Sequence, residues 1–333
     1  MNEILRLFEH LEIPSFGGNT YSVTPVPGAP SLLIAKSSDG APAVLHVLDA
    51  EVRTSAAPIR LRHLAVQPRV RARIRQKRET SESKVTVYQC QAHDPALQSY
   101  FLTAVVSALT SDALAADAEP GAVVRLLAEL FRSLETKGRS TAQGLWAVLF
   151  VIQESTKPAA LLSAWHEDVN ERYDFSWGAD RLEVKSTGRL EREHHFALEQ
   201  VRPHPPLRVW IASLFAVRST GGTSLGELVE AVRVRAASPR EAFKVDEIVA
   251  RALGDSMPDA LDARYDVDVA RSSLRFFRAE DVPWYEELPP SAVRNIRFEA
   301  TLNEIAALDR GAVEELSSDL LRAASRRGEA PAP

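Results

Sequence analysis

The first hundred residues alternate between short apolar runs and turn-forming residues, a pattern typical of β-strands. The apolar runs cover residues 32–35, 43–48 and 84–89. Over residues 69–75, arginine alternates with a small or branched apolar residue. Because successive side chains on a strand point to opposite faces, this segment predicts one apolar face and one basic face. The basic face carries Arg69, Arg71, Arg73 and Arg75.

From about residue 97 the apolar residues recur at helical spacing. Helices are predicted over residues 97–109, 122–132 and 144–153, and the last is apolar enough to be buried. Three short strands are predicted near residues 174–177, 182–187 and 194–197. The apolar run 207–217 is typical of a central strand. This mixture predicts an α/β fold with a mixed central sheet flanked by helices.

The remaining sequence also mixes both types of element. Ser224 and Glu227 have the spacing of a capping box, which predicts a helix starting at Ser224. Residues 219–222 before it are interpreted as a strand-to-helix turn. Further helices are predicted at residues 239–253 and 311–324, and strands at residues 265–269 and 273–278.

The same pattern predicts the domain organisation. We expect a β-rich N-terminal region over residues 1–96, an α/β core over residues 97–218, an α+β region over residues 219–325 and a tail over residues 326–333. A length of 333 residues suits about two domains.

Composition is that of a globular protein, with 45% hydrophobic and 26% charged residues. The longest apolar run covers residues 145–152, far short of the roughly 20 residues that span a bilayer. The first residues include acids and do not resemble a signal peptide. We therefore expect a cytoplasmic protein with no membrane contact. Cys90 is the only cysteine, which excludes disulfides within the chain and zinc sites built from several cysteines; a buried structural thiol is expected.

Charge is unevenly distributed. The net charge is −5, but residues 60–78 carry eight Lys or Arg residues and no acid. Such a segment favours local contact with phosphate groups. We expect the four arginines of residues 69–75 to contact a nucleic-acid backbone, helped by neighbouring basic residues; a solvated strand face is the alternative. The neighbours are Arg60, Arg62, Lys77 and Arg78.

Candidate chemistry is concentrated in residues 173–187, which are interpreted as a β-hairpin with its turn at residues 178–180. In the second strand Leu182 and Val184 should point into a core, whereas Glu183 and Lys185 point to the other side. Asp174, on the neighbouring strand, can face the same side. Two carboxylates and one ammonium would then converge at the edge of a sheet.

This set matches metal-dependent phosphodiester hydrolysis. Mg²⁺ or Mn²⁺ prefers oxygen ligands, which Asp174, Glu183 and the backbone carbonyl of Val184 can supply. The ion lowers the pKa of a bound water and stabilises charge on phosphate. Lys185 would orient that water or neutralise developing charge. An exposed cross-strand charge cluster is the alternative, because Glu-x-Lys also occurs at residues 82–84 and 135–137.

Several motifs in order resemble a family of bacterial proteins assigned to the PD-(D/E)XK, restriction-endonuclease-like nuclease superfamily. The similarity is loose over residues 100–300 and sharp over residues 144–226. The motifs are Gly144-Leu145-Trp146, then Trp165 and Tyr173-Asp174-Phe175, then Leu182-Glu183-Val184-Lys185-Ser186-Thr187, His195 with Glu199-Gln200, Ser213-Leu214, and Gly222-Thr223-Ser224-Leu225.

The resemblance implies a restriction-endonuclease-like core over residues 97–218. It implies that Asp174 and Glu183 are metal ligands, that Lys185 is the catalytic lysine and that Gln200 helps to shape the active site. Val148 stands where that family usually has a helix glutamate, which puts a two-metal mechanism in doubt.

The implied activity is metal-dependent DNA cleavage in a bacterial restriction or phage-defence system, with ATPase or methyltransferase subunits from the same operon as partners. A double-strand cut needs two active sites, so a homodimer is a further expectation. Two rival functions remain open: a catalytically weak DNA-binding or assembly subunit, and an RNA nuclease.

Two other features of the sequence bear on metal binding and nucleotide binding. His194 and His195 are neighbours on a predicted strand and cannot both reach one ion, so structural roles are favoured; if one of them matters, the resemblance points to His195. Residues 219–223 lack the Gly-Lys-Ser/Thr ending of a P-loop, which argues against ATP hydrolysis by this chain.

Overall fold

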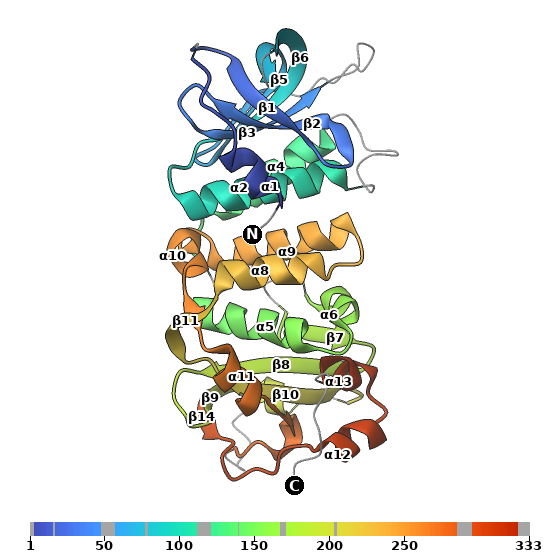
Figure 1. Ribbon diagram of the computed structural model, residues 1–333. Helices are drawn as coiled ribbons and strands as arrows, with labels where there is room; N and C mark the ends of the chain where they lie inside the picture. The colour runs from blue at the N-terminus through green and yellow to red at the C-terminus, as the bar shows by residue number, and fades with distance from the viewer. Residues whose placement is uncertain are drawn as a thin grey trace. The chain divides into compact units, whose positions relative to one another are not determined.

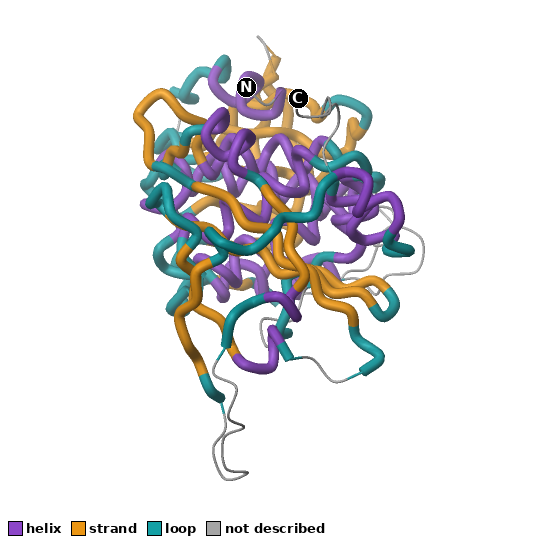
Figure 2. The backbone as a smooth tube through the Cα atoms, turned by 90° about the horizontal axis from the view of Figure 1, so that it is seen from below, coloured by secondary structure: helices purple, strands orange, loops and turns teal. Residues whose placement is uncertain are grey.

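The computed structural model describes residues 3–15, 17–47, 57–76, 79–111, 121–138, 140–166, 171–202, 205–284 and 295–325. The chain forms two compact units. The first contains Met1–Gly138 and Ser238–Pro258, and the second contains Arg139–Ala237 and Asp259–Pro333. Both units mix helices and strands (Figure 1, Figure 2), so the α/β class is confirmed. The units are not divided at residues 96 and 218, the boundaries expected from the sequence. The assignment of the nuclease core to residues 97–218 stays a prediction.

The described strands of the first unit form a six-stranded sheet in the order β1-β2-β3-β6-β5-β4. These strands are β1 (Thr20–Val26), β2 (Ala29–Ser37), β3 (Pro42–Val47), β4 (Ile59–Arg60), β5 (Leu64–Gln76) and β6 (Glu79–Cys90). β1 also pairs in parallel with β5, with Thr20 opposite Arg73. This last pairing closes five strands into a small barrel.

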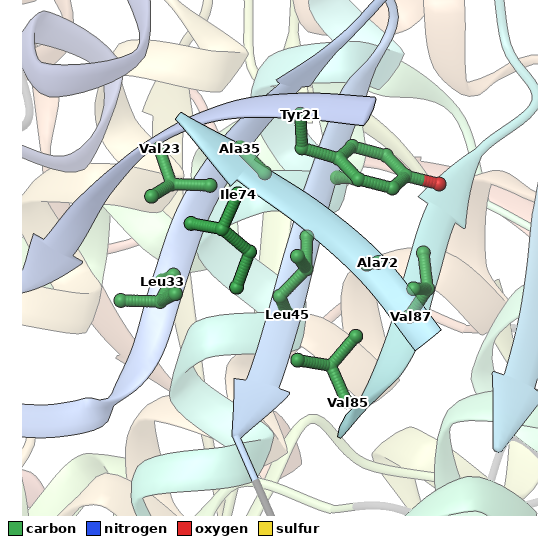
Figure 3. Close-up of a cluster of buried hydrophobic side chains, with 10 residues drawn as sticks. Tyr21, Val23, Leu33, Ala35, Leu45, Ala72, Ile74, Val85 and Val87 are labelled. Atoms are coloured by element: carbon green, nitrogen blue, oxygen red, sulfur yellow. The ribbon is translucent and has the colours of Figure 1, made fainter. Parts of the chain in front are cut away.

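Apolar side chains from these strands fill the inside of the barrel (Figure 3). The labelled set is Tyr21, Val23, Leu33, Ala35, Leu45, Ala72, Ile74, Val85 and Val87. Removing such side chains from water is the main stabilising contribution to this unit.

Strand β5 shows the predicted alternation in its second half. Ala72 and Ile74 are buried, whereas Arg71 and Arg73 are exposed. Arg69 departs from the pattern, because its φ is 56° and the register with β6 shifts between Gln67 and Val70. This irregularity takes Arg69 out of the regular alternation.

Helices of the first unit are α1 (Glu3–Glu9), α2 (Pro95–Thr110), α4 (Ala122–Ser133) and α9 (Pro239–Leu253). α2 packs on β2 and β3, and α9 packs on α2 and α4. Asp94 caps α2, and its side chain accepts a hydrogen bond from the Leu97 N–H. The predicted helices at residues 97–109, 122–132 and 239–253 are confirmed.

The second unit contains a four-stranded sheet in the order β13-β10-β8-β7. The strands are β7 (Phe175–Trp177), β8 (Asp180–Thr187), β10 (Arg208–Phe215) and β13 (Arg275–Arg278). β8 and β10 are parallel, and the other pairs are antiparallel. The strands predicted at residues 182–187, 207–217 and 273–278 are confirmed with small shifts of their ends.

Different elements cover the two faces of this sheet (Figure 1). One face packs against α5 (Ala142–Glu154), α6 (Pro158–Ala164) and α13 (Asp319–Ala324). The other face is covered by the antiparallel pair of β9 (Glu193–Ala197) and β14 (Arg297–Thr301), together with α7 (Leu198–Val201). On that second face Phe196 joins an apolar cluster with Val209 and Ile211.

The remaining described elements are β11 (Arg218–Ser224), α8 (Leu225–Val234), α10 (Met257–Leu261), β12 (Arg264–Tyr265), α11 (Val267–Ser273), the 3₁₀ helix η1 (Ala279–Asp281) and α12 (Arg310–Glu315). The predicted capping box is confirmed. The Glu227 N–H donates to Ser224 Oγ at 3.0 Å, and the Ser224 N–H donates to Glu227 Oε2 at 2.7 Å.

Three predictions of secondary structure are wrong. Residues 265–269 are mostly helix, because the Asp266 side chain accepts the N–H groups of Asp268 and Val269 and caps α11. The single helix predicted at residues 311–324 is two helices, since Ser318 caps a new one. Residues 219–222 belong to β11 and are not only a turn.

No described helix is long and apolar enough to cross a membrane. The predicted tail over residues 326–333 lies outside the described residues.

Candidate active site

Asp174, Glu183 and Lys185 come together on the β7–β8 hairpin. Asp174 lies immediately before β7, and the other two residues lie on β8. Trp177 pairs with Asp180, so the turn is Gly178-Ala179. Gly178 has a φ of 56°, a conformation that glycine adopts without steric cost. The hairpin expected from the sequence is therefore present.

The face on which Glu183 and Lys185 lie follows from the pairing of β8 with β10. Glu183 is opposite Ile211, and Lys185 is opposite Ser213. These residues share the face covered by β9 and α7. Leu182 alternates to the other face and is fully buried there.

Asp174 is tied to the strand next to it. Its Oδ2 accepts a hydrogen bond from the Val184 N–H at 2.7 Å. Burial and the nearby Glu183 carboxylate raise the pKa of Asp174 to about 8, against the opposing effects of this hydrogen bond and of Lys185. The carboxyl group therefore sits where a negative charge is unfavourable in the absence of a cation.

Lys185 is held by three groups. Its Nζ lies 2.7 Å from Glu183 Oε1 and 3.4 Å from Gln200 Oε1. The same ammonium lies 5.3 Å from the centre of the Phe196 ring. An ammonium fixed this closely beside a carboxylate pair can orient a water molecule or stabilise negative charge.

Gln200, on α7, is the fourth predicted site residue, and the structure brings it to the same place. Its Oε1 accepts the Ala197 N–H at 3.1 Å, and its Nε2 donates to the Arg172 carbonyl at 3.0 Å. With both ends of the amide fixed, Oε1 is aimed at Lys185. Gln200 thus contacts Lys185 from a position that its own two hydrogen bonds fix.

The donor set fits a hard divalent cation. Among the described residues, nothing donates a hydrogen bond to Asp174 Oδ1 or Glu183 Oε2, so each carboxylate keeps an oxygen for a metal ion. The N–H and C=O of one strand residue point to the same edge, so the Val184 carbonyl also faces Asp174, beyond the end of β7. No described group of three His, Cys, Asp or Glu residues could hold a metal. The candidate donor set consists of two carboxylates and a backbone oxygen.

The two neighbouring histidines differ sharply. His194 is 3% exposed and its Nε2 lies 2.8 Å from Ser213 Oγ, whereas His195 is exposed. Burial, followed by the charges of Lys185 and Arg192, lowers the pKa of His194 to about 3. The expectation that the two rings face opposite sides is confirmed.

His194, not His195, lies on the face of Lys185, and the sequence analysis did not single it out. Ser213 was the sequence signal that could have pointed to His194. It is a serine within the apolar run that forms β10, where it is completely buried and needs a hydrogen-bonding partner.

Val148 lies within the buried run of α5. α5 packs on the face opposite to Glu183 and Lys185, and the Gln143 Nε2 lies 3.4 Å from Ser186 Oγ on that face. Val148 brings no carboxylate to this helix.

The basic face of β5 belongs to the first unit. Arg73 lies 3.9 Å from Glu82, and Arg75 lies 3.1 Å from Glu12. Arg71 is directly opposite Lys84, and both are exposed. Lys77 and Arg78 lie outside the described residues. Two of the predicted phosphate-binding arginines therefore already face a carboxylate.

Cys90 is buried, and burial raises the pKa of its thiol to about 11. The prediction of a buried thiol is confirmed. A thiol that stays protonated is a poor nucleophile and a poor metal ligand.

Comparison with known proteins gives one match. A family model described as "Putative PD-(D/E)XK family member, (DUF4420)" matches residues 4–303. No curated protein and no solved structure matches the chain. The matched range covers most of both units and includes Asp174, Glu183, Lys185 and Gln200. The chain therefore belongs to this family, whose description points to a nuclease.

Proposed function

We propose that the chain is a metal-dependent DNA endonuclease with a restriction-endonuclease-like core. The observation that carries this proposal is the convergence of Asp174, Glu183 and Lys185 at one edge of a mixed sheet. The Val184 N–H fixes Asp174, and Gln200 helps to hold Lys185. Family membership supports the same reaction class.

The order of elements supports the proposed core. Helix α5 precedes the β7–β8 hairpin, and β9 and α7 follow it. β10 then enters the sheet parallel to β8. β8 thus lies between β7 and β10 in the sheet. Glu183 and Lys185 lie on β8, and Asp174 lies just before β7.

Asp174, Glu183 and the Val184 carbonyl would hold Mg²⁺ or Mn²⁺. When bound, such an ion polarises the scissile phosphate and makes water a better nucleophile near neutral pH. The raised pKa of Asp174 supports this assignment, because a bound cation would relieve the repulsion between the carboxylates of Asp174 and Glu183.

The residues of the chain have distinct roles in this proposal. Lys185 orients the attacking water and stabilises the charge that develops on the phosphate oxygens. Gln200 keeps the ammonium in place through its fixed amide. The Phe196 ring limits the access of bulk water from one side of Lys185.

DNA is the proposed substrate, and bacterial restriction or anti-phage defence in the cytoplasm is the proposed setting. Operon-encoded ATPase or methyltransferase subunits are the proposed partners. A homodimer would supply the two active sites that a double-strand cut needs. Arg71 and Lys84 are the best placed of the β5–β6 cations to contact a DNA backbone, since they face no carboxylate among the described residues.

A cleavage assay tests the proposal. Plasmid and phage DNA are incubated with Mg²⁺ or Mn²⁺ and the wild type, Asp174→Ala or Lys185→Ala, each with and without the neighbouring operon products. Metal-dependent cleavage that both substitutions abolish is the expected result. RNA is added as a competitor in a parallel reaction. Preferential cleavage of RNA would show that RNA, and not DNA, is the substrate.

If the protein binds DNA but cleaves it under none of these conditions, the proposed nuclease function is wrong. A catalytically weak DNA-binding or assembly subunit would take its place. Val148 is then the first position to examine, because it stands where the family usually has a helix glutamate.

A further inference from the structure

A second polar cluster lies on the same face of the sheet as the proposed catalytic residues. Ser176 follows Asp174 by two positions, and Arg181 precedes Glu183 by two positions. Ser176 and Arg181 are direct partners across the β7–β8 hairpin. Because side chains two positions apart on a strand share a face, this cluster lies about 7 Å along the strands from the carboxylates.

His166 extends the cluster past the edge strand. Trp165 pairs with Phe175, and the His166 N–H donates to the Asp174 carbonyl at 3.2 Å. The imidazole Nε2 lies 2.5 Å from Ser176 Oγ. His166, Ser176 and Arg181 are all half-buried, so part of each residue stays accessible to solvent.

The charge of Arg181 is fixed in place and not neutralised. Its Nη1 donates to the backbone carbonyls of Gly178 at 2.8 Å and Asp180 at 2.7 Å. No described carboxylate pairs with it, and its Nη2 and Nε have no acceptor among the described residues. A rigid guanidinium with free donors is suited to phosphate, which it can bind with two hydrogen bonds.

We propose that His166, Ser176 and Arg181 bind the phosphate adjacent to the scissile phosphate. The inference rests on the proposed nuclease function and narrows its substrate class. The spacing of the two clusters is close to that between successive phosphates of one strand, so the site takes an internal segment of a polynucleotide. A mononucleotide or a simple phosphate ester would occupy only half of it.

Turn stabilisation is the competing role for Arg181, because its contacts are to hairpin carbonyls. Loss of Arg181 would then lower the melting temperature without changing the affinity for DNA. The affinity of folded protein for DNA separates the two roles.

The test measures binding by fluorescence anisotropy with a labelled DNA duplex, in Ca²⁺ or in EDTA to keep the DNA intact. The variants are Arg181→Gln, Ser176→Ala and the control Arg235→Gln, which removes an exposed arginine at the end of α8. We expect Arg181→Gln to weaken binding about tenfold and Ser176→Ala about threefold. Arg181→Gln should also lower the slope of log affinity against log salt by about one.

A modified substrate locates the contact. Once the wild-type cleavage position is known, a neutral methylphosphonate replaces the phosphate next to it. Wild-type affinity should fall, whereas Arg181→Gln should lose little more, because the partner of that phosphate is already missing.

Each outcome is decisive. Equal affinities of Arg181→Gln, Arg235→Gln and wild type overturn the subsite. Arg181-dependent binding with no cleavage by the wild type keeps Arg181 as a phosphate contact and overturns the nuclease. Absence of DNA and RNA binding by the wild type overturns both.

Discussion

The Val184 N–H donates to Asp174 Oδ2 at 2.7 Å, which joins a residue at the end of a loop to the middle of the central strand. Val184 separates Glu183 from Lys185, so a single hydrogen bond sets the position of Asp174 relative to both. Any shift of β7 along β8 would break this bond and separate the carboxylates. The geometry of the proposed metal site therefore depends on the register of the hairpin.

Asp174→Asn should stabilise the metal-free protein at neutral and alkaline pH. The amide oxygen can still accept the Val184 N–H, but the buried negative charge is gone. The pKa of Asp174 is raised from 3.8 to about 8, so the folded state holds its proton more tightly than the unfolded chain. The free energy of unfolding of the wild type should then fall as the pH rises from about 4 to about 8. Urea unfolding at pH 8 should show a gain of roughly 2 kcal/mol or more for Asp174→Asn.

Asp180→Asn is the matched control for this gain. Asp180 is also buried on the hairpin, but its carboxylate is paired with Arg208 Nε at 2.7 Å. Neutralising this carboxylate should destabilise the protein by about 1 kcal/mol or more, since it breaks an ion pair whose acidic partner is buried. A loss of stability in both variants would show that the charge of Asp174 carries no penalty.

Divalent metal should raise the melting temperature of the wild type in a concentration-dependent way, because it binds the folded state. EDTA should reverse the shift. Differential scanning fluorimetry with Mn²⁺ should show no shift for Asp174→Asn or Glu183→Gln. A shift that survives both substitutions would place the ion elsewhere.

Lys185→Met should reduce the rate of DNA cleavage by about 100-fold or more while leaving DNA affinity nearly unchanged. The lysine acts on charge that forms in the transition state, so the effect belongs to kcat. Lys137→Met supplies a control at another Glu-x-Lys sequence, where Lys137 is exposed in the first unit. Similar rates for all three proteins would remove Lys185 from the reaction.

His194 should make the protein sensitive to mild acid. Its pKa is lowered from 6.5 to about 3. Below pH 6.5 this imidazole is therefore protonated in the unfolded chain but stays neutral in the folded state until the pH approaches 3. This contribution to stability is complete above pH 6.5 and is lost as the pH falls toward 3, by about 1.4 kcal/mol at pH 5.5. Comparison of unfolding at pH 7 and pH 5.5 should show a smaller loss for His194→Gln than for wild type. His195→Gln should behave like wild type, because that ring is exposed.

Arg71→Gln should weaken DNA binding about threefold and lower its salt dependence by about one phosphate contact, if β5 contacts the backbone as proposed. Arg75→Gln should have the smaller effect, because Arg75 is already paired with Glu12. Anisotropy measured at several salt concentrations compares the two. Unchanged binding by Arg71→Gln would leave this strand as a solvated surface.

Local patterns predicted much of the fold. Helices α2, α4, α5 and α9 follow from apolar spacing, and β5 follows from its alternation. Asp266 shows where such a prediction fails. The alternating apolar residues after it are typical of a strand. Its side chain, however, accepts two backbone N–H groups, and the segment forms helix α11.

Long-range pairings were beyond a local pattern. The parallel pairing of β1 with β5 joins residues 53 positions apart, such as Thr20 and Arg73, and no periodicity in the sequence indicates it. In the candidate site, the sequence predicted that Asp174, Glu183 and Lys185 share one side. It could not predict the contact of Lys185 with Gln200, nor that of His194 with Ser213, because both depend on how β9 and α7 fold over the sheet.

The path of the chain has a consequence for synthesis. The first segment of the first unit ends at Gly138, but the unit also contains α9, which the ribosome makes only after residues 139–237 of the second unit. Until then the faces of α2 and α4 that α9 covers stay open, and the nascent chain carries exposed apolar surface. A fragment cut before Ser238 would keep that defect permanently. Each unit is built from two separated segments of the chain, so cutting the chain once yields neither unit by itself.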